Sequence, residues 1–335
     1  MGARASADAR ALVVSGPTRQ TVAMAAAPQT VMPVVVVHGG AGQGVVSKKR
    51  SLRLRDALTH AVDAARAALG EGGSALDAVV EAVVVLEDCE LFNAGLGSVL
   101  TEDGEVELDA AVMDGERRRA GAVAVVRGQP NPVRVARAVL DAGRHALLAG
   151  PGAERFARDA GFPDIAPGEL LTDHRREQLA DRAAGEAPRP GFGDPTPLGS
   201  DTVGAVVLDA AGHLAAATST GGIAGKAAGR VGDSPLVGAG LYAQDGVCAV
   251  SATGTGERLI EAVVAHEVSA RIRLKGATVQ RAVEDACATV GGDVGLIAID
   301  GRGHVGLSCT TPVFQRALAI GDGPVRTGVH GAETL

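Results

Sequence analysis

The stretch PTPLGSDTVGAVVLD, residues 195–209, joins a Pro- and Gly-rich segment to an apolar run at the bond between Asp201 and Thr202. Residues 181–201 contain four prolines and four glycines, too many for a helix or a central strand. Residues 203–208 are apolar or Gly, which is typical of a buried strand. The junction suits a linker that meets a strand. It also suits a site where the chain cuts itself and exposes Thr202 as a new N-terminus.

The second interpretation has a chemical reason behind it. A threonine hydroxyl becomes a nucleophile only when a base takes its proton. An N-terminal threonine carries such a base in its own α-amine, whose unperturbed pKa of about 7.7–8.0 lies near neutral pH. An internal threonine has only an amide nitrogen, so the preceding bond must break first. On the junction alone, an ordinary threonine that opens a strand remains the more common case.

The residues after Thr202 predict a hairpin, with one strand at 202–209 and a second at 213–220. The second strand ends in Thr218, Ser219 and Thr220. Because the two strands are expected to run antiparallel, these hydroxyls are expected to lie beside Thr202. Ordinary strand threonines are the alternative interpretation.

Two Gly-rich loops further along the chain add groups suited to an amino-acid ligand. GRVGDSP, residues 229–235, places Arg230 three positions before Asp233. Arginine binds carboxylates and aspartate binds ammonium groups, although a surface ion pair is by itself the more common case. TGTGE, residues 253–257, offers backbone N–H groups near an expected helix start, a suitable place for a developing oxyanion. Together these features indicate amide hydrolysis on an amino-acid-like substrate.

The rest of the chain predicts alternating pairs of strands and helices. This alternation favours a layered α/β protein over a simple βαβ repeat. Residues 1–33 are expected to be a disordered extension. The first half is expected to contain a buried strand at 34–37 that ends in the loop HGGAGQG (38–44), helices at 52–69, 74–87 and 132–143, a loop and at least two strands within 92–126, and helical pieces within 151–180. The second half is expected to continue after the hairpin with a strand at 247–252, helices from about 257 and at 278–290, and final strands at 295–300 and 304–310.

Composition argues against several classes of protein. The net charge is −7, Trp is absent and the basic residues are scattered, which disfavours a nucleic-acid surface. No apolar run reaches the ~18 residues that a membrane-spanning helix needs. The four cysteines are far apart, so free thiols in a reducing cytoplasm are favoured over disulfides. Neither the cysteines nor the histidines show metal-ligand spacing. HGGAGQG lacks the GxGxxG pattern, which leaves a nucleotide-binding enzyme as a weak alternative.

Seven motifs in order resemble the plant-type L-asparaginase/isoaspartyl peptidase family: HGGAG, LFNAGLGSVL, ELDAAVMDG, DTVGAVVLD, AAATSTGG, GRVGDSPLVGAG and TGTGE. The resemblance runs from about Pro33 to about Asp300 and is weaker over 151–195 and at the C-terminal tail. It implies an N-terminal-nucleophile hydrolase with a four-layer αββα sandwich. It also implies autocleavage after Asp201 into an α chain (34–201) and a β chain (202–335) of one catalytic domain.

The resemblance implies a role for individual residues. Thr202 would be the nucleophile, assisted by Thr220. Arg230 would bind the substrate α-carboxylate and Asp233 its α-amine. The remaining implied site residues are Thr253 and Gly254 for the oxyanion hole, Gly256 in the pocket wall, and Asn93 near the scissile region.

The resemblance further implies a sodium ion, no organic cofactor, and a homodimer of αβ units that acts on a small amino acid or dipeptide. The ion would be held by main-chain carbonyls of one loop, those of Leu86, Glu87, Cys89, Phe92, Ala94 and Leu96. Carbonyl oxygens are hard ligands and need no side-chain spacing. A scan for side-chain ligands would therefore miss such a site.

One position departs from the family pattern. Close asparaginase relatives usually carry Gly before the nucleophile, whereas this chain carries Asp201. Asp at this place is similar to the glycosylasparaginase and threonine-aspartase branches. TGTGE in place of TGNGD, and the absence of Trp, argue against glycosylasparaginase. An uncleaved, inactive relative that serves as a binding protein is the remaining alternative.

Overall fold

The computed structural model describes residues 31–166, 168–184 and 202–335. The expected extension over residues 1–30 and the expected linker over 185–201, including Asp201, lie outside the described residues. Residues 31 and 33, expected to belong to the extension, are already bonded to the fold. The Val31 N–H donates to Ala210 O at 3.4 Å, and Pro33 O accepts from the Gly321 N–H at 2.8 Å.

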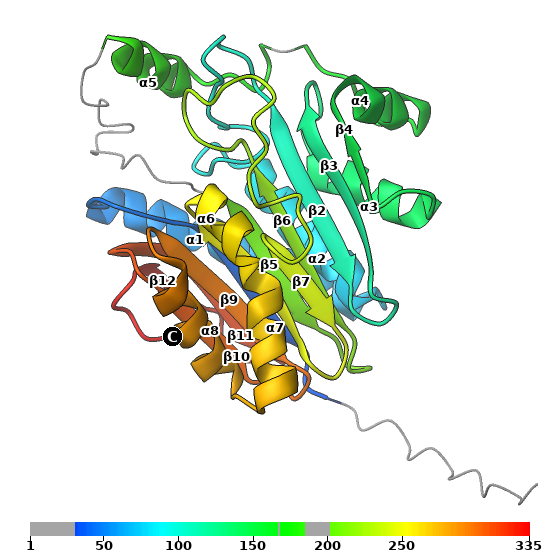
Figure 1. Cartoon of the computed structure of the whole chain (residues 1–335). Helices are drawn as coiled ribbons and strands as arrows, with labels where there is room; N and C mark the ends of the chain where they lie inside the picture. The colour runs from blue at the N-terminus through cyan, green and yellow to red at the C-terminus, as the bar shows by residue number, and fades with distance from the viewer. Residues whose placement is uncertain (1–30, 167, 185–201) are drawn as a thin grey trace, which may run out of the picture.

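The larger of two sheets has eight strands in the order β12-β11-β1-β5-β6-β2-β3-β4 (Figure 1). Nearly all neighbours are antiparallel, and only β3 and β4 are parallel. The strands are β1 (Val34–Gly42), β2 (Leu108–Asp114), β3 (Arg119–Val126), β4 (Leu147–Ala149), β5 (Val203–Leu208), β6 (Leu214–Thr220), β11 (Val313–Ile320) and β12 (Arg326–His330).

The smaller sheet has four strands in the order β10-β9-β8-β7, all antiparallel. Figure 1 shows α7 and α8 in front of the strands and α2 behind them. The elements are β7 (Leu241–Gln244), β8 (Cys248–Gly254), β9 (Val294–Asp300), β10 (Val305–Cys309), α1 (Lys48–Gly70), α2 (Ala75–Glu87), α3 (Pro132–Ala142), α4 (Gly150–Asp159), α5 (Asp173–Ala183), α6 (Gly256–Ala262), α7 (Val264–Lys275) and α8 (Val279–Val290). The chain is a mixed α/β protein.

Two apolar cores lie on opposite faces of the larger sheet. Successive side chains of a strand point to opposite faces, and β1 follows this rule. Val35 and Val37 join the core that contains α1, α2 and α3. Val34 and Val36 join the core that contains the smaller sheet, α7 and α8. Burial on both faces explains why this strand is a continuous run of valines rather than an alternating one.

Several expected elements are confirmed. The hairpin of β5 and β6 is antiparallel, with Val203 opposite Ser219. Helix α2 begins with a capping box in which Ser74 and Asp77 exchange hydrogen bonds. Helix α3 begins at Pro132 and is capped at its C-terminal end by Gly143, which has the left-handed conformation favoured there. Helix α8 agrees with the expected range, with Thr278 as its N-cap.

The first strand is longer than expected. The sequence predicts that it ends before His38, whereas β1 continues through the glycines to Gly42. Pairing with β11 extends this far, with a bulge between His38 and Gly40. A Cβ at Gly39 would lie 2.3 Å from Phe92 Cε1, so the close approach of a loop requires glycine there. Tertiary contacts therefore override the low strand propensity of glycine.

Other differences concern the middle and the end of the chain. Strands β4, β7, β11 and β12 were not expected. Residues 181–183, expected to be linker, belong to α5. The helix expected from about Glu257 is divided into α6 and α7 at Val263, whose φ is 48°.

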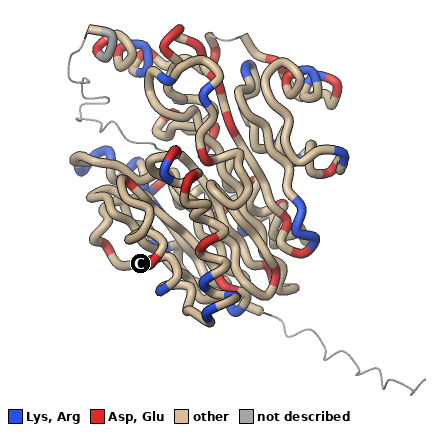
Figure 2. The backbone as a smooth tube through the Cα atoms, viewed as in Figure 1, with Lys and Arg blue, Asp and Glu red and all other residues tan. Residues whose placement is uncertain are grey.

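Charged residues of both signs are interspersed along the chain (Figure 2). Within the described ranges, no helix is long and apolar enough to span a bilayer.

Candidate active site

Thr202 stands directly before the first residue of β5, and its hydroxyl faces β6. Its Oγ1 donates to Thr220 Oγ1 at 3.0 Å, and Thr220 Oγ1 accepts from the Gly222 N–H at 3.0 Å. Thr202 is only 3% exposed. The hairpin register produces this contact, because Val203 lies opposite Ser219 and the next pair outward is Thr202 and Thr220.

Only one of the three expected hydroxyls reaches Thr202. The Thr218 hydroxyl donates instead to Ser234 O at 2.6 Å. Ser219 points to the other face because side chains alternate along a strand, and Thr218, on the same face as Thr220, lies two residues further along, opposite Gly204. Thr218 instead connects β6 to the loop that carries Asp233.

A narrow cavity adjoins Thr202 and contains six of the residues singled out from the sequence. Thr253 and Asn93 lie outside its lining. The lining residues are Thr202, Thr220, Gly222, Ile223, Arg230, Gly232, Asp233, Gly254 and Gly256. Segments that are far apart in the sequence therefore supply one small site.

Asp233 presents an unsatisfied carboxylate oxygen at this site. The residue is 4% exposed, and its Oδ2 has no hydrogen-bond partner among the described residues. Burial raises the pKa of Asp233 to about 7, and the positive charge of Arg230 only partly opposes this effect. A buried acceptor without a donor is costly, so an ammonium group bound here would relieve it.

Arg230 is the cation of the site, and it is paired with Glu257. Its Nε and Nη2 donate to Glu257 Oε1 at 3.0 and 2.8 Å. The Arg230 side chain is 15% exposed and the Glu257 side chain 56% exposed, so the pair lies at the rim of the cavity. A Cβ on Gly256 would lie 2.8 Å from Arg230 Nη2 and 3.0 Å from Asp233 Oδ1. Glycine at 256 therefore keeps both charged groups accessible.

Buried charges beneath the loop support it, and the sequence did not reveal them. Lys226 is 2% exposed, and its Nζ donates to Glu107 O at 2.8 Å. The Glu107 carboxylate accepts from the Gly229 N–H at 2.8 Å, directly before Arg230. Burial lowers the pKa of Lys226 and raises that of Asp109. The only sequence signal was the acidic motif ELDAAV, which carries Glu107 and Asp109.

Thr253 and Gly254 end a strand directly before the expected helix start, because Thr255 is the N-cap of α6 and the helix begins at Gly256. They are the last residues of β8 and pair with Gly295 and Val294 of β9. Gly254 has a φ of 145°, and a Cβ there would lie 2.0 Å from Asp293 O. Only glycine fits, which fixes the backbone beside Thr202.

His38 is a close neighbour of this site that sequence analysis passed over. It is fully buried, lies opposite Gly204 of β5, and contacts Ser251 Oγ at 2.8 Å through Nε2. Burial lowers the pKa of His38 to about 3, so the imidazole is neutral. A Cβ at Gly204 would lie 2.4 Å from His38 Nε2. The sequence feature that could have indicated His38 is a histidine placed directly after the run of valines in β1.

Asn93 connects its own loop by hydrogen bonds to the segment that follows Thr220. Its Nδ2 donates to Gly222 O at 2.6 Å, and its Oδ1 accepts from the Val99 N–H at 2.9 Å. Its backbone carbonyl accepts from the Gly221 N–H at 3.0 Å. Both ends of the amide are used, so Asn93 positions the segment after Thr220 rather than facing the cavity.

The loop expected to hold sodium leaves the C-terminal end of α2. It is closed by the Leu96 N–H, which donates to Glu87 O at 2.8 Å, and by the Phe92 N–H, which donates to Cys89 O at 3.2 Å. Burial raises the pKa of the Glu87 carboxyl to about 8. Among the described residues, no group of three or more His, Cys, Asp or Glu side chains is placed to hold a metal. An ion here would depend on main-chain carbonyls.

Comparison with known proteins adds independent findings. A family profile described as asparaginase (Asparaginase_2) matches residues 31–329. The chain is 44% identical to an isoaspartyl peptidase of Salmonella typhimurium over 89% of this chain and 98% of that protein. It is 41% identical to an isoaspartyl peptidase/L-asparaginase of Bos taurus over 90% and 97%. It is 44% identical to a plant-type L-asparaginase of Pyrobaculum calidifontis over 87% and 97%.

Proposed function

The chain belongs to the asparaginase family, and we propose that it is a self-cleaving hydrolase of β-aspartyl amides. Its substrates are L-asparagine, which yields L-aspartate and ammonia, and isoaspartyl dipeptides, which yield aspartate and the C-terminal amino acid. One observation carries the proposal. The Thr202 hydroxyl, hydrogen-bonded to Thr220, lines the same small cavity as Arg230 and as the unsatisfied carboxylate of Asp233.

Maturation creates the catalytic base. Thr202 Oγ1 attacks the carbonyl of Asp201, the acyl group moves from the Thr202 nitrogen to its oxygen, and water hydrolyses the resulting ester. The products are an α chain that ends in a carboxylate at residue 201 and a β chain that begins at Thr202. The freed α-amine of Thr202 then takes the proton of its own hydroxyl. Asp201 lies outside the described residues, so the proposal for this bond rests on the sequence and on Thr202.

Substrate binding uses the two charged groups of the cavity. Arg230 exchanges Glu257 for the substrate α-carboxylate, since its partner lies at the exposed rim. Asp233 accepts the substrate ammonium and thereby satisfies its Oδ2. With both ends of the amino acid fixed, the side-chain amide is directed toward Thr202.

Thr202 Oγ1 then attacks the amide carbon, and the carbonyl oxygen becomes an oxyanion held by Thr253 and the Gly254 N–H. The carbon–nitrogen bond breaks, and the leaving amine takes the proton held by the Thr202 α-amine. Water hydrolyses the β-aspartyl ester and regenerates the enzyme. Thr220 orients the Thr202 hydroxyl through the 3.0 Å hydrogen bond.

Further parts of the proposal concern the architecture. The facing sheets, with helices packed on each, support a four-layer αββα sandwich of the N-terminal-nucleophile type. The loop over residues 86–96 fits a sodium ion, because it starts at the C-terminal end of α2, where the helix dipole favours a cation. The ion would stabilise the loop that carries Asn93. Pairing of two αβ units and a cytoplasmic location complete the proposal.

Intact-mass analysis under denaturing conditions tests the central claim. After incubation at neutral pH, the purified chain should give two fragments, and the second should begin at Thr202. Thr202→Ala should give one uncut chain without hydrolysis of asparagine. Thr59→Ala, which removes the same hydroxyl from the surface of α1, should be cut and active. A wild-type chain that stays whole and behaves as Thr202→Ala would leave only a binding role.

A further inference from the structure

A second, much larger cavity lies at a different place, between β10 of the smaller sheet and β11 of the larger one. Its volume is about 590 Å³, which is within the usual range for small-molecule sites. It shares no lining residue with the cavity at Thr202. The two sheets pack directly against each other at β1 and β9. At the next strands, β11 and β10, this cavity separates them.

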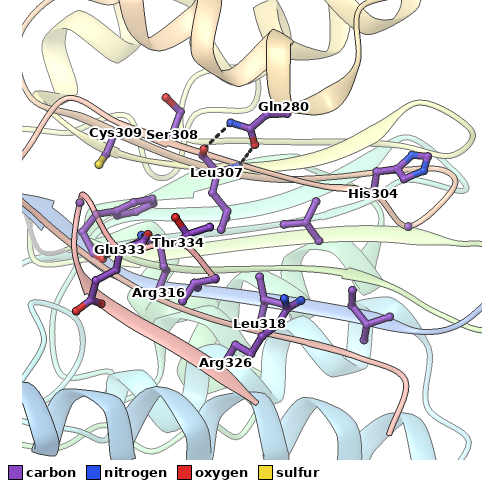
Figure 3. A pocket seen from close by; sticks show the side chains of 16 residues that line it. Gln280, His304, Leu307, Ser308, Cys309, Arg316, Leu318, Arg326, Glu333 and Thr334 are labelled. Carbon is purple, nitrogen blue, oxygen red and sulfur yellow. Dashed lines mark hydrogen bonds between the residues drawn. The ribbon is translucent and has the colours of Figure 1, made fainter. Parts of the chain in front are cut away.

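The walls follow from strand periodicity. Val305 and Leu307 of β10 face the cavity on one side, and Phe314, Leu318 and Ile320 of β11 face it on the other. In Figure 3 Leu307 points into the space from above, and Leu318 points toward it from below. Most of this surface is hydrocarbon, as expected for the core between two sheets.

Arg316 is the exception in this pattern. It lies between Phe314 and Leu318 on the same face of β11, yet it is only 3% exposed. Its Nη1 donates to Phe314 O and His330 O at 2.6 and 3.0 Å, and its Nη2 donates to Glu333 O. Its Nε has no partner, and no carboxylate pairs with it within residues 31–166, 168–184 and 202–335. A buried cation without a counter-charge is costly.

The neighbouring groups compensate that charge only in part, through the nearby charge of Glu333 and the ring of Phe314, whose centroid lies 5.1 Å from Arg316 Cζ. The Glu333 carboxylate is bound by Arg55 Nη2 at 2.6 Å and by the Val329 N–H at 2.8 Å. A second cation, Arg326 of β12, reaches into the cavity beside Leu318 (Figure 3). Of the five N–H groups of a guanidinium, the three carbonyls use three on Arg316, which leaves Nε and one hydrogen of Nη2. A guanidinium suits a carboxylate, and Nε has almost no accessible surface in the present side-chain conformation, so a ligand would reach it only after a small movement of Arg316.

We propose that this cavity binds a small apolar monocarboxylate. The carboxylate lies against Arg316 and Arg326, and the hydrocarbon body fills the space between Leu307, Phe314 and Leu318. The ligand supplies the missing counter-charge and the missing apolar contacts together. This inference concerns a separate site, so it stands or falls independently of the hydrolase.

Isothermal titration calorimetry with the mature protein tests the proposal, with sodium octanoate as the probe. Saturable binding of one octanoate per chain is expected. The neutral 1-octanol should bind at least about tenfold more weakly, because it lacks the charge-assisted hydrogen bonds. Inorganic phosphate should neither bind nor compete. Absence of saturable octanoate binding, or equal binding of phosphate or octanol, would overturn the proposal and leave Arg316 as a clamp for the C-terminal segment.

Variants locate the binding. Arg326→Met removes the exposed cation and should raise the octanoate Kd by about tenfold or more. Leu307→Trp fills the cavity and should abolish binding. Arg273→Met, which removes an exposed charge from α7, should bind as the parent does. Unchanged melting temperature and asparagine hydrolysis would show that each variant is folded. Octanoate binding that survives both Leu307→Trp and Arg326→Met in folded protein would place the ligand elsewhere and refute the assignment.

Discussion

The two cavities of this protein differ in size and in the chemistry of their walls. The cavity at Thr202 is narrow, and hydroxyls, glycines and the charged pair Arg230 and Asp233 surround it. The cavity at β10 and β11 is much larger, and apolar side chains line it together with two arginines, Glu333 and several other polar residues. Covalent chemistry needs a few polar groups that converge on one reacting atom. Binding of a small molecule needs a cavity with apolar walls that can bury most of the ligand's surface away from water. Volume alone therefore does not identify the reactive site.

The largest effect that separates the two cavities should come from the charged groups at Thr202. Arg230→Met and Asp233→Asn should each lower kcat/KM for asparagine by about 100-fold or more, because each leaves one end of a zwitterion unpaired in a buried site. Steady-state kinetics on fully cut protein measures this loss. Glu257→Gln is the matched control at the same guanidinium. It should change kcat/KM by less than about tenfold, since Glu257 lies at the exposed rim.

The assignment of substrate binding to the cavity at Thr202 would be wrong if the kinetic effects of the arginine variants were reversed. Near-normal kinetics in Arg230→Met, together with a large loss in Arg326→Met, would move substrate binding to the larger cavity. Cleavage at Thr202, monitored by mass, keeps the result interpretable because it separates failed maturation from failed substrate binding.

The next effect is the pH dependence of the smaller cavity. Asp233 must be charged to bind an ammonium, and burial raises its pKa to about 7 in the free enzyme. Below this pH the carboxyl is neutral, so protonation of Asp233 alone should lower kcat/KM about tenfold per pH unit as the pH drops. The Thr202 α-amine, whose unperturbed pKa is about 7.7–8.0, must also be neutral and adds a second limb below that pH. A pH profile of kcat/KM between pH 5 and 8 tests this, and Asp233→Asn should keep only the amine limb within its residual activity, with a slope lower by about one.

The same pKa shift predicts that stability changes with pH in the opposite direction to activity. The folded-state pKa of Asp233 is raised above its unfolded value of about 3.8, so the folded protein binds the extra proton between these values. The contribution of this group to the free energy of unfolding therefore falls as pH rises from about 4 to 7. Asp233→Asn should remove that decrease. If the wild type instead gained stability relative to Asp233→Asn over this range, the carboxylate would be compensated in solution.

Local signals in the sequence revealed much of the smaller site and little of the larger. The hairpin that begins at Thr202 and the helix capped by Ser74 depend on neighbours in the sequence, and both were predicted. The family resemblance named six of the nine residues that line the Thr202 cavity, although their roles remain proposals. The pairing of Arg230 with Glu257 and the unsatisfied oxygen of Asp233 were not visible, because they depend on how distant loops meet.

The larger cavity escaped prediction for a different reason. Gln315 and Arg316 interrupt the apolar run of β11, so its periodicity does not indicate a buried strand. The strand is buried because it pairs with β1, from the other end of the chain. Arg316, which interrupts the apolar pattern of this strand, also contributes a positive charge to the wall of the cavity.

The smallest effect should separate the packed and hollow parts of the same inter-sheet core. Leu208 of β5 is fully buried, and Leu318 of β11 is 2% exposed but lines the larger cavity. Leu208→Ala should lower the free energy of unfolding by about 3–4 kcal/mol, within the range for a packed leucine. Leu318→Ala should cost about 2 kcal/mol, because part of its side chain already faces space and fewer contacts are lost. Urea unfolding in an uncut Thr202→Ala background measures both, since one chain suits two-state analysis. Equal costs would mean that the cavity is collapsed in solution. A smaller cost at Leu318 that rises when octanoate is present would instead show that the ligand, and not the protein, completes the packing between β10 and β11.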